Sequence, residues 1–327
     1  MGKETDIVCV GTALVDSIIW GFDPNPINPT GYRAEEAYLK VGGEAVNEAV
    51  AATRLGAKTS IVCSLGNDDA GDLVMTYLQK NNVDTSNVIR SGNPTPVTTL
   101  VVKPVEGTRK SITNYAHRYN FHPEQYLDRI TSAKALIMGS LFRAPFNDVE
   151  IIREVVMAAS DAGMLIFADT KLPNFGTIAL EELKGILPYI DYITPNEDEA
   201  KFYSGEEDYE KMANVFLSYG AKNVIIKRGG KGLYFKNENT HYLMSAFPIA
   251  AKDATGAGDC LVAGLASELL RGTNIENALW FANACGGICT TEVGAGTALH
   301  DREQVLQFME QQGYDCSGFA PQTASDS

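Results

Sequence analysis

Apolar strands and amphipathic helices alternate along most of this chain, and that alternation limits the folds it can adopt. Short buried strands are predicted at 7–11, 60–65, 134–139, 164–168, 190–194 and 223–227. Helices are predicted at 44–55, 69–80, 147–162, 178–187, 197–203, 208–219 and 261–270. Because parallel strands need long crossover connections, this order favours an α/β fold: a mainly parallel sheet with helices on both faces.

Two stretches interrupt the alternation. Residues 12–40 and 93–118 have little helical periodicity and contain short alternating segments such as 98–102 and 110–113. They could form a small β-sheet that projects from the main body and covers a site as a lid. Two ordinary surface hairpins would fit the pattern equally well. A further hairpin is expected over 232–244.

Length and charge narrow the class of protein. The 327 residues could form one large domain or two medium ones. The net charge of −14 argues against broad attraction to nucleic acid or to an anionic membrane, although a small basic pocket remains compatible with it. No apolar run has membrane-spanning length, the first residues do not resemble a signal peptide, and the six cysteines follow no zinc or disulfide spacing. We therefore expect a reducing, cytoplasmic setting.

The most informative motif is KDATGAGDC at 252–260, where glycines and an acid precede a long apolar helix. The backbone N–H groups of Gly256, Ala257, Gly258 and Asp259 would lie in the first helical turn, where no intrahelical carbonyl reaches them. Together with the helix dipole they would form an anion site, and glycine allows a phosphate to approach closely. An acid there could take a proton from a hydroxyl that attacks a phosphate. Alternatively, Asp259 only complements the helix dipole.

A second glycine pair precedes the helix predicted at 44–55. Gly42 and Gly43 would let a ligand lie against the backbone, and Asn47, one turn into the helix, offers a donor and an acceptor that suit a polyol. Asp16, after the first strand, could accept hydrogen bonds from two neighbouring hydroxyls. A flexible loop with a surface asparagine is the alternative.

Polar residues also follow two later strands, at the edge where parallel sheets bind ligands. Asn196 and Glu199 have capping-box spacing, and an acid there could also hold Mg²⁺-bound water beside phosphates. Lys227 opens a basic, glycine-rich turn with Gly229 and Gly232, which could approach a polyphosphate or simply form a β-turn. The chain has neither a P-loop nor a dinucleotide fingerprint on its first helix.

Taken together, these motifs resemble the ribokinase/phosphofructokinase-B (PfkB) family of carbohydrate kinases along nearly the whole chain. The resemblance rests on four motifs in the family's order: GGEAVN with the following helix (42–56), LGxDxxG (65–71), TPNxxE (194–199) and the motif at 252–259. It implies a single ribokinase-like domain over 1–327, an αβα sandwich with a β-sheet lid formed by about 12–40 and 93–118. The implied reaction is ATP-dependent phosphorylation of a primary hydroxyl of a small carbohydrate such as ribose, fructose or a ketodeoxygluconate.

The resemblance also implies a role for each motif. Asp259 would be the catalytic base, and Gly256, Ala257 and Gly258 would form the anion hole with it. The sugar site would comprise Asp16, Gly42, Gly43 and Asn47. The ATP and Mg²⁺ site would comprise Asn196, Glu199, Lys227, Gly229, Gly232 and Asn283, with Asn283 near the adenine. Many members bind a monovalent cation such as K⁺ beside the anion hole, and Asp253, Thr255 and the turn at 293–296 would supply its ligands.

Three departures from ribokinases bear on the substrate. Leu141, Phe142 and Arg143 stand where ribokinases carry a glutamate, Lys227 replaces a usual threonine, and Ala298 replaces a serine of the cation loop. The last change puts potassium dependence in doubt. Residues 115–118 (YAHR), with Arg143 and Lys171, could instead give the sugar pocket a cationic wall suited to an acidic sugar.

Two rival functions remain open. A nucleoside kinase of the same fold would need an aromatic pocket, to which Tyr32, Tyr115 or Phe142 could contribute. A catalytically silent sugar-binding regulator would be expected to lack an intact anion-hole motif, which this chain retains. Family analogy also suggests a homodimer through the lid sheet.

Overall fold

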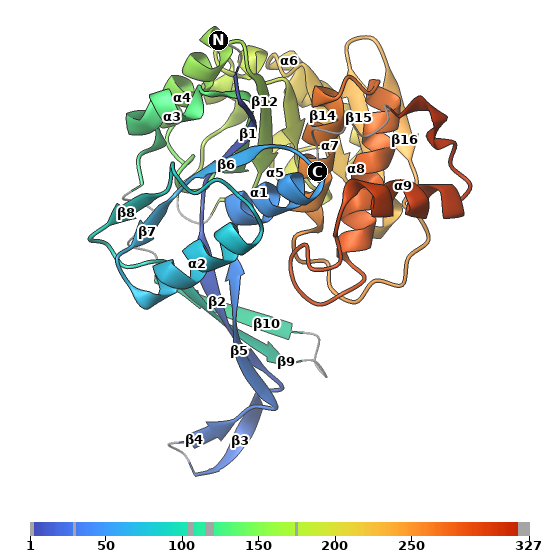
Figure 1. The fold of residues 1–327 in the computed structure, drawn as a ribbon. Helices are drawn as coiled ribbons and strands as arrows, with labels where there is room; N and C mark the ends of the chain where they lie inside the picture. The colour runs from blue at the N-terminus through green and yellow to red at the C-terminus, as the bar shows by residue number, and fades with distance from the viewer. Residues whose placement is uncertain (1–2, 29–30, 104–107, 115–120, 174–175, 320–327) are drawn as a thin grey trace.

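An eight-stranded sheet forms the centre of the larger part of the molecule (Figure 1). The computed structural model describes residues 3–28, 31–103, 108–114, 121–173 and 176–319. In spatial order the strands are β16 (His241–Met244), β15 (Leu233–Asn237), β14 (Asn223–Lys227), β13 (Tyr192–Thr194), β12 (Leu165–Thr170), β11 (Ala133–Leu141), β1 (Thr5–Val10) and β6 (Thr59–Val62). The strands from β14 to β6 run parallel, and the β15–β16 hairpin adds two antiparallel ones. The expected α/β class and the hairpin over 232–244 are confirmed.

Helices cover both faces of this sheet because successive strand residues point to opposite sides. Ile7 and Cys9 of β1 belong to one apolar core, and Val8 and Val10 belong to the other. The first core includes residues of α1 (Glu44–Arg54), α2 (Asp69–Lys80), α7 (Ala257–Leu270), α8 (Ile275–Cys289) and α9 (Arg302–Gln311). The second includes residues of α3 (Leu127–Ile130), α4 (Val149–Asp161), α5 (Glu197–Ser204) and α6 (Tyr209–Ser218). The result is a three-layer αβα sandwich (Figure 1).

The two irregular stretches meet in a separate four-stranded sheet. Its order is β10 (Thr108–Thr113), β9 (Val97–Lys103), β2 (Leu14–Trp20) and β5 (Glu36–Gly42). β2 pairs with β5 antiparallel and with β9 parallel, so segments far apart in the sequence share one sheet. A hairpin of β3 (Asp23–Asn28) and β4 (Gly31–Arg33) extends beyond it, and the whole unit projects from the main body (Figure 1). We call β2, β5, β9 and β10 the small sheet.

Several element predictions need correction. The helix expected at 178–187 is wrong: two 3₁₀ turns, Leu180–Leu183 and Leu187–Tyr189, occupy the region. Gly185 and Pro188 interrupt it, because glycine weakens a helix and proline cannot donate within one. The strand expected at 60–65 divides into β6 and β7 (Ser64–Gly66), and β7 pairs with β8 (Ile89–Ser91) in another sheet.

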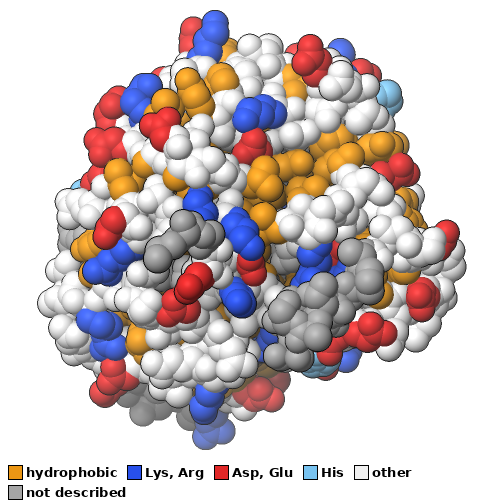
Figure 2. All heavy atoms as spheres, turned by 45° about the horizontal axis from the view of Figure 1, so that its top comes forward, with side chains coloured by type: hydrophobic (Ala, Val, Ile, Leu, Met, Phe, Trp, Pro, Cys, Tyr) orange, Lys and Arg blue, Asp and Glu red, His pale blue; other side chains and the backbone are white. Residues whose placement is uncertain are grey.

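The face of the molecule drawn in Figure 2 has no large basic patch among its described residues that would attract nucleic acid. Figure 2 shows acidic and basic side chains interspersed on one face, with hydrophobic ones grouped between them. None of the described helices is long and apolar enough to cross a membrane.

Candidate active site

The first turn of α7 has the conformation that the glycine motif predicts. Gly256 is in the left-handed region (φ 78°), and α7 begins at the next residue. A Cβ on Gly256 would lie 2.6 Å from the Cβ of Ala295, so only glycine permits this packing. The backbone N–H of Ala257 donates to Ala254 O at 3.2 Å and is therefore already engaged. Gly258 and Asp259 follow in the first turn, where N–H groups have no carbonyl four residues back in the helix.

Asp259 is held by the residue predicted to bind sugar. Asn47 Nδ2 donates to Asp259 Oδ2 at 2.7 Å, joining α1 to α7. Asp259 is buried, with 5 % of its surface exposed. Burial raises the pKa of its carboxyl group; Lys171 opposes that shift, and Asp169 and Glu44 add to it.

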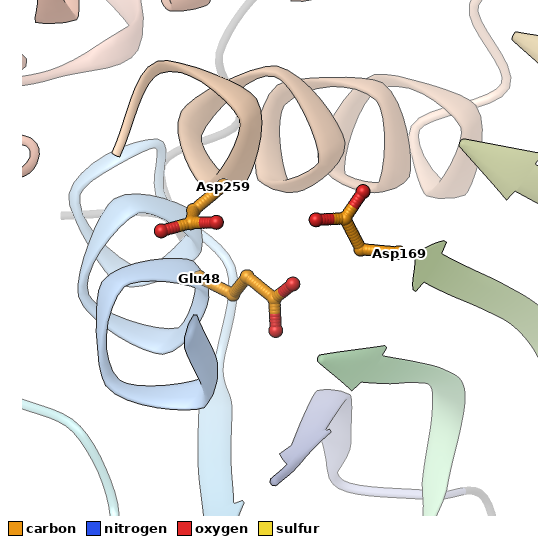
Figure 3. A group of neighbouring side chains, drawn as sticks. All are labelled: Glu48, Asp169 and Asp259. Atoms are coloured by element: carbon orange, nitrogen blue, oxygen red, sulfur yellow. The ribbon is translucent and has the colours of Figure 1, made fainter. Parts of the chain in front are cut away.

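Three buried carboxylates converge at this point. Oxygens of Glu48, Asp169 and Asp259 lie within 4.8 Å of one another. They come from α1, the end of β12 and the start of α7, and they surround one space (Figure 3). Glu48 is fully buried, and neither carboxylate oxygen has a hydrogen-bond partner among the described residues. Burial, followed by repulsion from Asp259, raises the pKa of Glu48 well above its ordinary value.

Two lysines partly balance this charge. Lys171 Nζ lies 3.3 Å from Asp169 Oδ2, and Lys227 Nζ forms an ion pair with the other oxygen of Asp169. Burial opposes the charge of Asp169, but the two lysines outweigh it and hold the pKa of that carboxyl group below its ordinary value. The Lys227 ammonium also faces the start of α7, since a Cβ on Gly258 would lie 3.1 Å from it. A cation at a positive helix end is unfavourable alone, so this arrangement favours an added anion.

The four predicted sugar residues lie together where the small sheet meets α1. A Cβ on Gly42 would lie 2.7 Å from Asp16 Oδ2, so this glycine gives the carboxylate its room. Gly43 has a φ of 105°, and a Cβ there would lie 2.3 Å from Thr12 O. Asn47 follows in α1 and reaches Asp259. The four residues therefore form a continuous group beside the candidate base.

Asn196 and Glu199 form a capping box at α5. Asn196 Oδ1 accepts from Glu199 N at 2.9 Å, and Glu199 Oε2 accepts from Asn196 N at 2.9 Å. Thr170 Oγ1 also donates to Glu199 Oε2 at 2.8 Å. Lys227 N donates to Pro195 O at 2.8 Å, which brings the β14 end beside this cap. Burial raises the pKa of Glu199, and Lys227 opposes that shift.

The remaining nucleotide candidates lie around residues 244–245. Gly232 has a φ of 93°, and a Cβ there would lie 2.1 Å from Met244 O. Asn283 Nδ2 donates to Ser245 O at 2.8 Å from the neighbouring helix α8. Gly229 lies in the 3₁₀ turn Gly229–Lys231, which connects β14 to this region.

Asp253 organises the loop before the anion-hole motif. Its Oδ1 accepts from Thr255 N at 3.0 Å and from Thr255 Oγ1 at 2.7 Å. Its Oδ2 accepts from Gly294 N at 2.8 Å, which links this loop to the turn at 293–296. Ala298, two residues after that turn, is buried and has no polar side chain to offer it.

Of the residues proposed for a cationic wall, Arg143 and Lys171 are described, and the other four are outside the described residues. Arg143 Nε donates to Leu172 O at 2.5 Å, and Lys171 pairs with Asp169. Residues 115–118 are not among those described. Of the aromatic candidates, Phe142 stacks on Tyr203 with ring centroids 4.0 Å apart, and Tyr32 is exposed on β4 beside Phe22.

Sequence reasoning missed two members of the carboxylate group. Asp169 is the next-to-last residue of β12, and the rule that ligands gather at the carboxyl ends of parallel strands would have selected it. Glu48 lies among alanines and valines on the buried side of α1, and a charged residue within an apolar stripe is itself a signal.

Comparison with known proteins agrees with this architecture. A family model described as pfkB family carbohydrate kinase matches residues 4–302. A ribokinase of Haemophilus influenzae is 28% identical over 289 residues, covering 86% of this chain and 90% of the relative. A probable fructokinase-5 of Arabidopsis thaliana is 29% identical over 317 residues, covering 91% of this chain and 95% of the relative.

Solved structures share the fold. An Arabidopsis thaliana ribokinase complexed with ribose and ATP superposes with a TM-score of 0.80 at 24% identity, covering 94% of this chain and 99% of that one. A ribokinase from Thermotoga maritima gives a TM-score of 0.77 at 28% identity with the same coverage.

Proposed function

This chain belongs to the pfkB family of carbohydrate kinases, and we propose that it transfers the γ-phosphate of ATP to a primary hydroxyl of a small sugar, with Asp259 as general base. The observation that carries the proposal is the position of Asp259. Its carboxylate is buried in the first turn of α7, and the sugar-site candidate Asn47 holds one of its oxygens.

Proton transfer is the first task of this site. Asp259 takes the proton of the sugar hydroxyl as that oxygen attacks the γ-phosphorus, and a positioned general base contributes about 10²–10⁴-fold to the rate. The bond to Asn47 Nδ2 fixes one carboxylate oxygen and leaves the other to receive the proton. The raised pKa makes the carboxylate a stronger base than an exposed aspartate.

Charge stabilisation is the second task. The N–H groups of Gly256, Gly258 and Asp259 are the donors that we assign to the transferred phosphate, and Ala257 contributes as part of the same turn. The Lys227 ammonium faces the same helix end from β14. One donor of this kind typically contributes about 3–4 kcal/mol to the transition state.

The sugar and the nucleotide would approach from different sides. Asp16, Gly42, Gly43 and Asn47 bind the sugar hydroxyls beneath the small sheet, which acts as a lid. The nucleotide lies along the strand ends, with Asn196 and Glu199 beside its phosphates, Gly229 and Gly232 along its length, and Asn283 nearest the adenine.

The cluster of three carboxylates, Glu48, Asp169 and Asp259, has the chemistry to hold a magnesium ion. Mg²⁺ prefers carboxylate and water oxygens, and Glu48 brings a buried carboxylate with no hydrogen-bond partner among the described residues. Glu199 and Asp169 are the residues that would hold its water shell. When bound, the ion neutralises charge on the phosphates of ATP.

Three broader assignments stay predictions: one domain over 1–327, a cytoplasmic setting and a homodimer through the small sheet.

A substrate panel tests the proposal. ADP release from Mg-ATP is measured with ribose, fructose, tagatose, 2-keto-3-deoxygluconate and several nucleosides, and ATP binding is measured in parallel. We expect turnover with one or a few of the sugars. Turnover with nucleosides alone would replace the proposal with a nucleoside kinase, and sugar binding without turnover would favour a silent regulator.

A further inference from the structure

A lysine of the small sheet occupies the turn that would face a monovalent cation. Lys40 Nζ donates to Val293 O at 2.9 Å. The ammonium lies against the backbone of the next residue, because a Cβ on Gly294 would be 2.3 Å from Nζ. Gly294 also has a φ of 109°, so this approach depends on glycine.

Several other oxygens of this region also accept hydrogen bonds. Asp253 accepts with both oxygens, from Thr255 and from Gly294 N. Gly296 O accepts from Arg54 Nη1 at 2.7 Å. Ala298, at the position of the ribokinase serine, has no side-chain oxygen, and its carbonyl accepts from Gln304 Nε2 at 2.9 Å. Two side-chain cations, Lys40 and Arg54, already donate to carbonyls of the turn at 293–296, so the residues present do not fit a potassium ion.

We propose that the Lys40 ammonium replaces the monovalent cation beside the anion hole, so that phosphoryl transfer by this chain does not require potassium. The proposal rests on the proposed kinase function and concerns how its anion hole is held. Potassium was one of the options that the family resemblance left open, and the contacts of Lys40 argue against it.

The position of Lys40 also connects the lid to the phosphate site. Lys40 lies on β5 directly opposite Asp16 of β2, the predicted sugar ligand. Through Val293 it holds the turn whose Ala295 packs against Gly256. A metal ion would hold this turn independently of the lid, whereas Lys40 holds it only while β5 is in place. Lys40 is therefore a positioning residue that acts through the turn at 293–296.

The experiment compares wild type, Lys40→Met and Lys110→Met, the last an exposed lysine on β10 of the same sheet. ADP release from Mg-ATP with the sugar that the wild type turns over fastest is measured in KCl and in N-methyl-D-glucamine chloride at equal ionic strength. We expect wild type and Lys110→Met to change less than twofold between the salts. Lys40→Met should lose at least tenfold in kcat in N-methyl-D-glucamine and recover at least threefold in KCl.

A second readout does not need activity. The melting temperature of each ligand-free protein is measured in the two salts, and KCl should raise it for Lys40→Met alone. A wild-type enzyme that loses tenfold in turnover without potassium, or whose melting temperature rises in KCl, would overturn the inference. A Lys40→Met protein that matches Lys110→Met in both readouts would also overturn it.

If Lys40→Met does not fold, two other measurements decide the question. One is the salt comparison of the wild type, and the other is Lys40→Arg, which keeps the charge and should stay potassium-independent. If wild type turns over no sugar, the kinase proposal fails, and the melting measurements still test the site.

Discussion

Asn47 Nδ2 donates a hydrogen bond to Asp259 Oδ2 over 2.7 Å, across 212 residues of sequence. The two residues belong to motifs that sequence analysis assigns to different tasks, one to the sugar and one to the phosphate. Their contact places both tasks in one site, where the helices α1 and α7 pack together.

Replacing Asn47 with Ala should therefore affect binding and chemistry together. The mutation removes a polyol partner and frees the Asp259 carboxylate to rotate, so we expect KM for the sugar to rise and kcat to fall, each by about 10–100-fold. Steady-state kinetics with the sugar varied at saturating ATP measure both. Asn277→Ala, which removes an amide that accepts from Tyr314 at 3.0 Å, is the control and should leave kcat within twofold. Unchanged kcat in Asn47→Ala would separate Asn47 from the chemical step.

Lys227→Met should weaken the phosphate site. Its ammonium faces the start of α7 and pairs with Asp169, so we expect KM for ATP to rise and kcat to fall, together reducing kcat/KM for ATP by about 10²-fold or more. Lys222→Met, directly before the opposite end of β14 and also paired with an aspartate (Asp191), is the matched control. Equal ATP kinetics in the two variants would contradict a phosphate role for Lys227.

The sequence indicates the individual motifs because their geometry is local. Glycines before a helix predict a tight turn with free N–H donors; the left-handed Gly256 before α7 fits the turn, whereas the Ala257 N–H is engaged by Ala254 O. The alternation of strands and helices likewise predicts the parallel sheet. Local patterns do not show which motifs meet: the contact of Asn47 with Asp259 and the convergence of Glu48 and Asp169 depend on packing between α1, β12 and α7.

Failures of prediction have equally specific causes. Leu180, Leu183 and Leu187 are all buried and have helical spacing, which suggested one helix where Gly185 and Pro188 allow only short turns. The set of predicted helices ends at 270 and lacks α8 and α9. α8 is buried on nearly all sides, so its residues show little amphipathic periodicity.

Glu48→Gln should stabilise the protein at neutral pH but not at acid pH. The folded-state pKa of Glu48 is raised, so the folded state binds this proton more tightly than the unfolded state. Its contribution to stability then falls as pH rises above the ordinary glutamate pKa of about 4.3. Glutamine does not titrate and lacks this loss. The melting temperature of Glu48→Gln minus that of wild type should therefore grow from near zero at pH 4 to a positive value at pH 7. The exposed Glu303→Gln should show no such trend, and a destabilised Glu48→Gln at pH 7 would contradict the expectation.

The pH dependence of catalysis should reflect the raised pKa of Asp259. Only the ionised carboxylate can accept a proton, so kcat/KM for the sugar should rise with pH through this pKa and level off above it. We expect the midpoint above the ordinary aspartate pKa of about 3.9. A profile of kcat/KM for the sugar, taken within the range where the protein stays folded, measures it. A rate that falls with pH across the same range would argue against a carboxylate base.

Arg302→Met should cost stability without changing chemistry. Arg302 Nε lies 2.5 Å from Glu268 Oε1 in a fully buried pair to which Thr273 Oγ1 also donates at 2.8 Å. Leaving Glu268 without this partner should lower the free energy of unfolding by about 3–5 kcal/mol. Arg153→Met, which breaks an exposed pair with Glu150, should lower it by about 1 kcal/mol or less. Denaturant titration of the two variants measures the free energy of unfolding. Equal losses in Arg302→Met and Arg153→Met would contradict a stabilising role for the buried pair.

The role of Asp259 as general base is tested most directly by the turnover of Asp259→Asn with Mg-ATP and the sugar that the wild type turns over fastest. Asparagine keeps the shape of the side chain and cannot take the proton, so kcat should fall by about 10²–10⁴-fold while ATP binding and the melting temperature stay close to wild type. A mutant that retains kcat within about tenfold, equal to about 1.4 kcal/mol of barrier, would contradict Asp259 as the catalytic base.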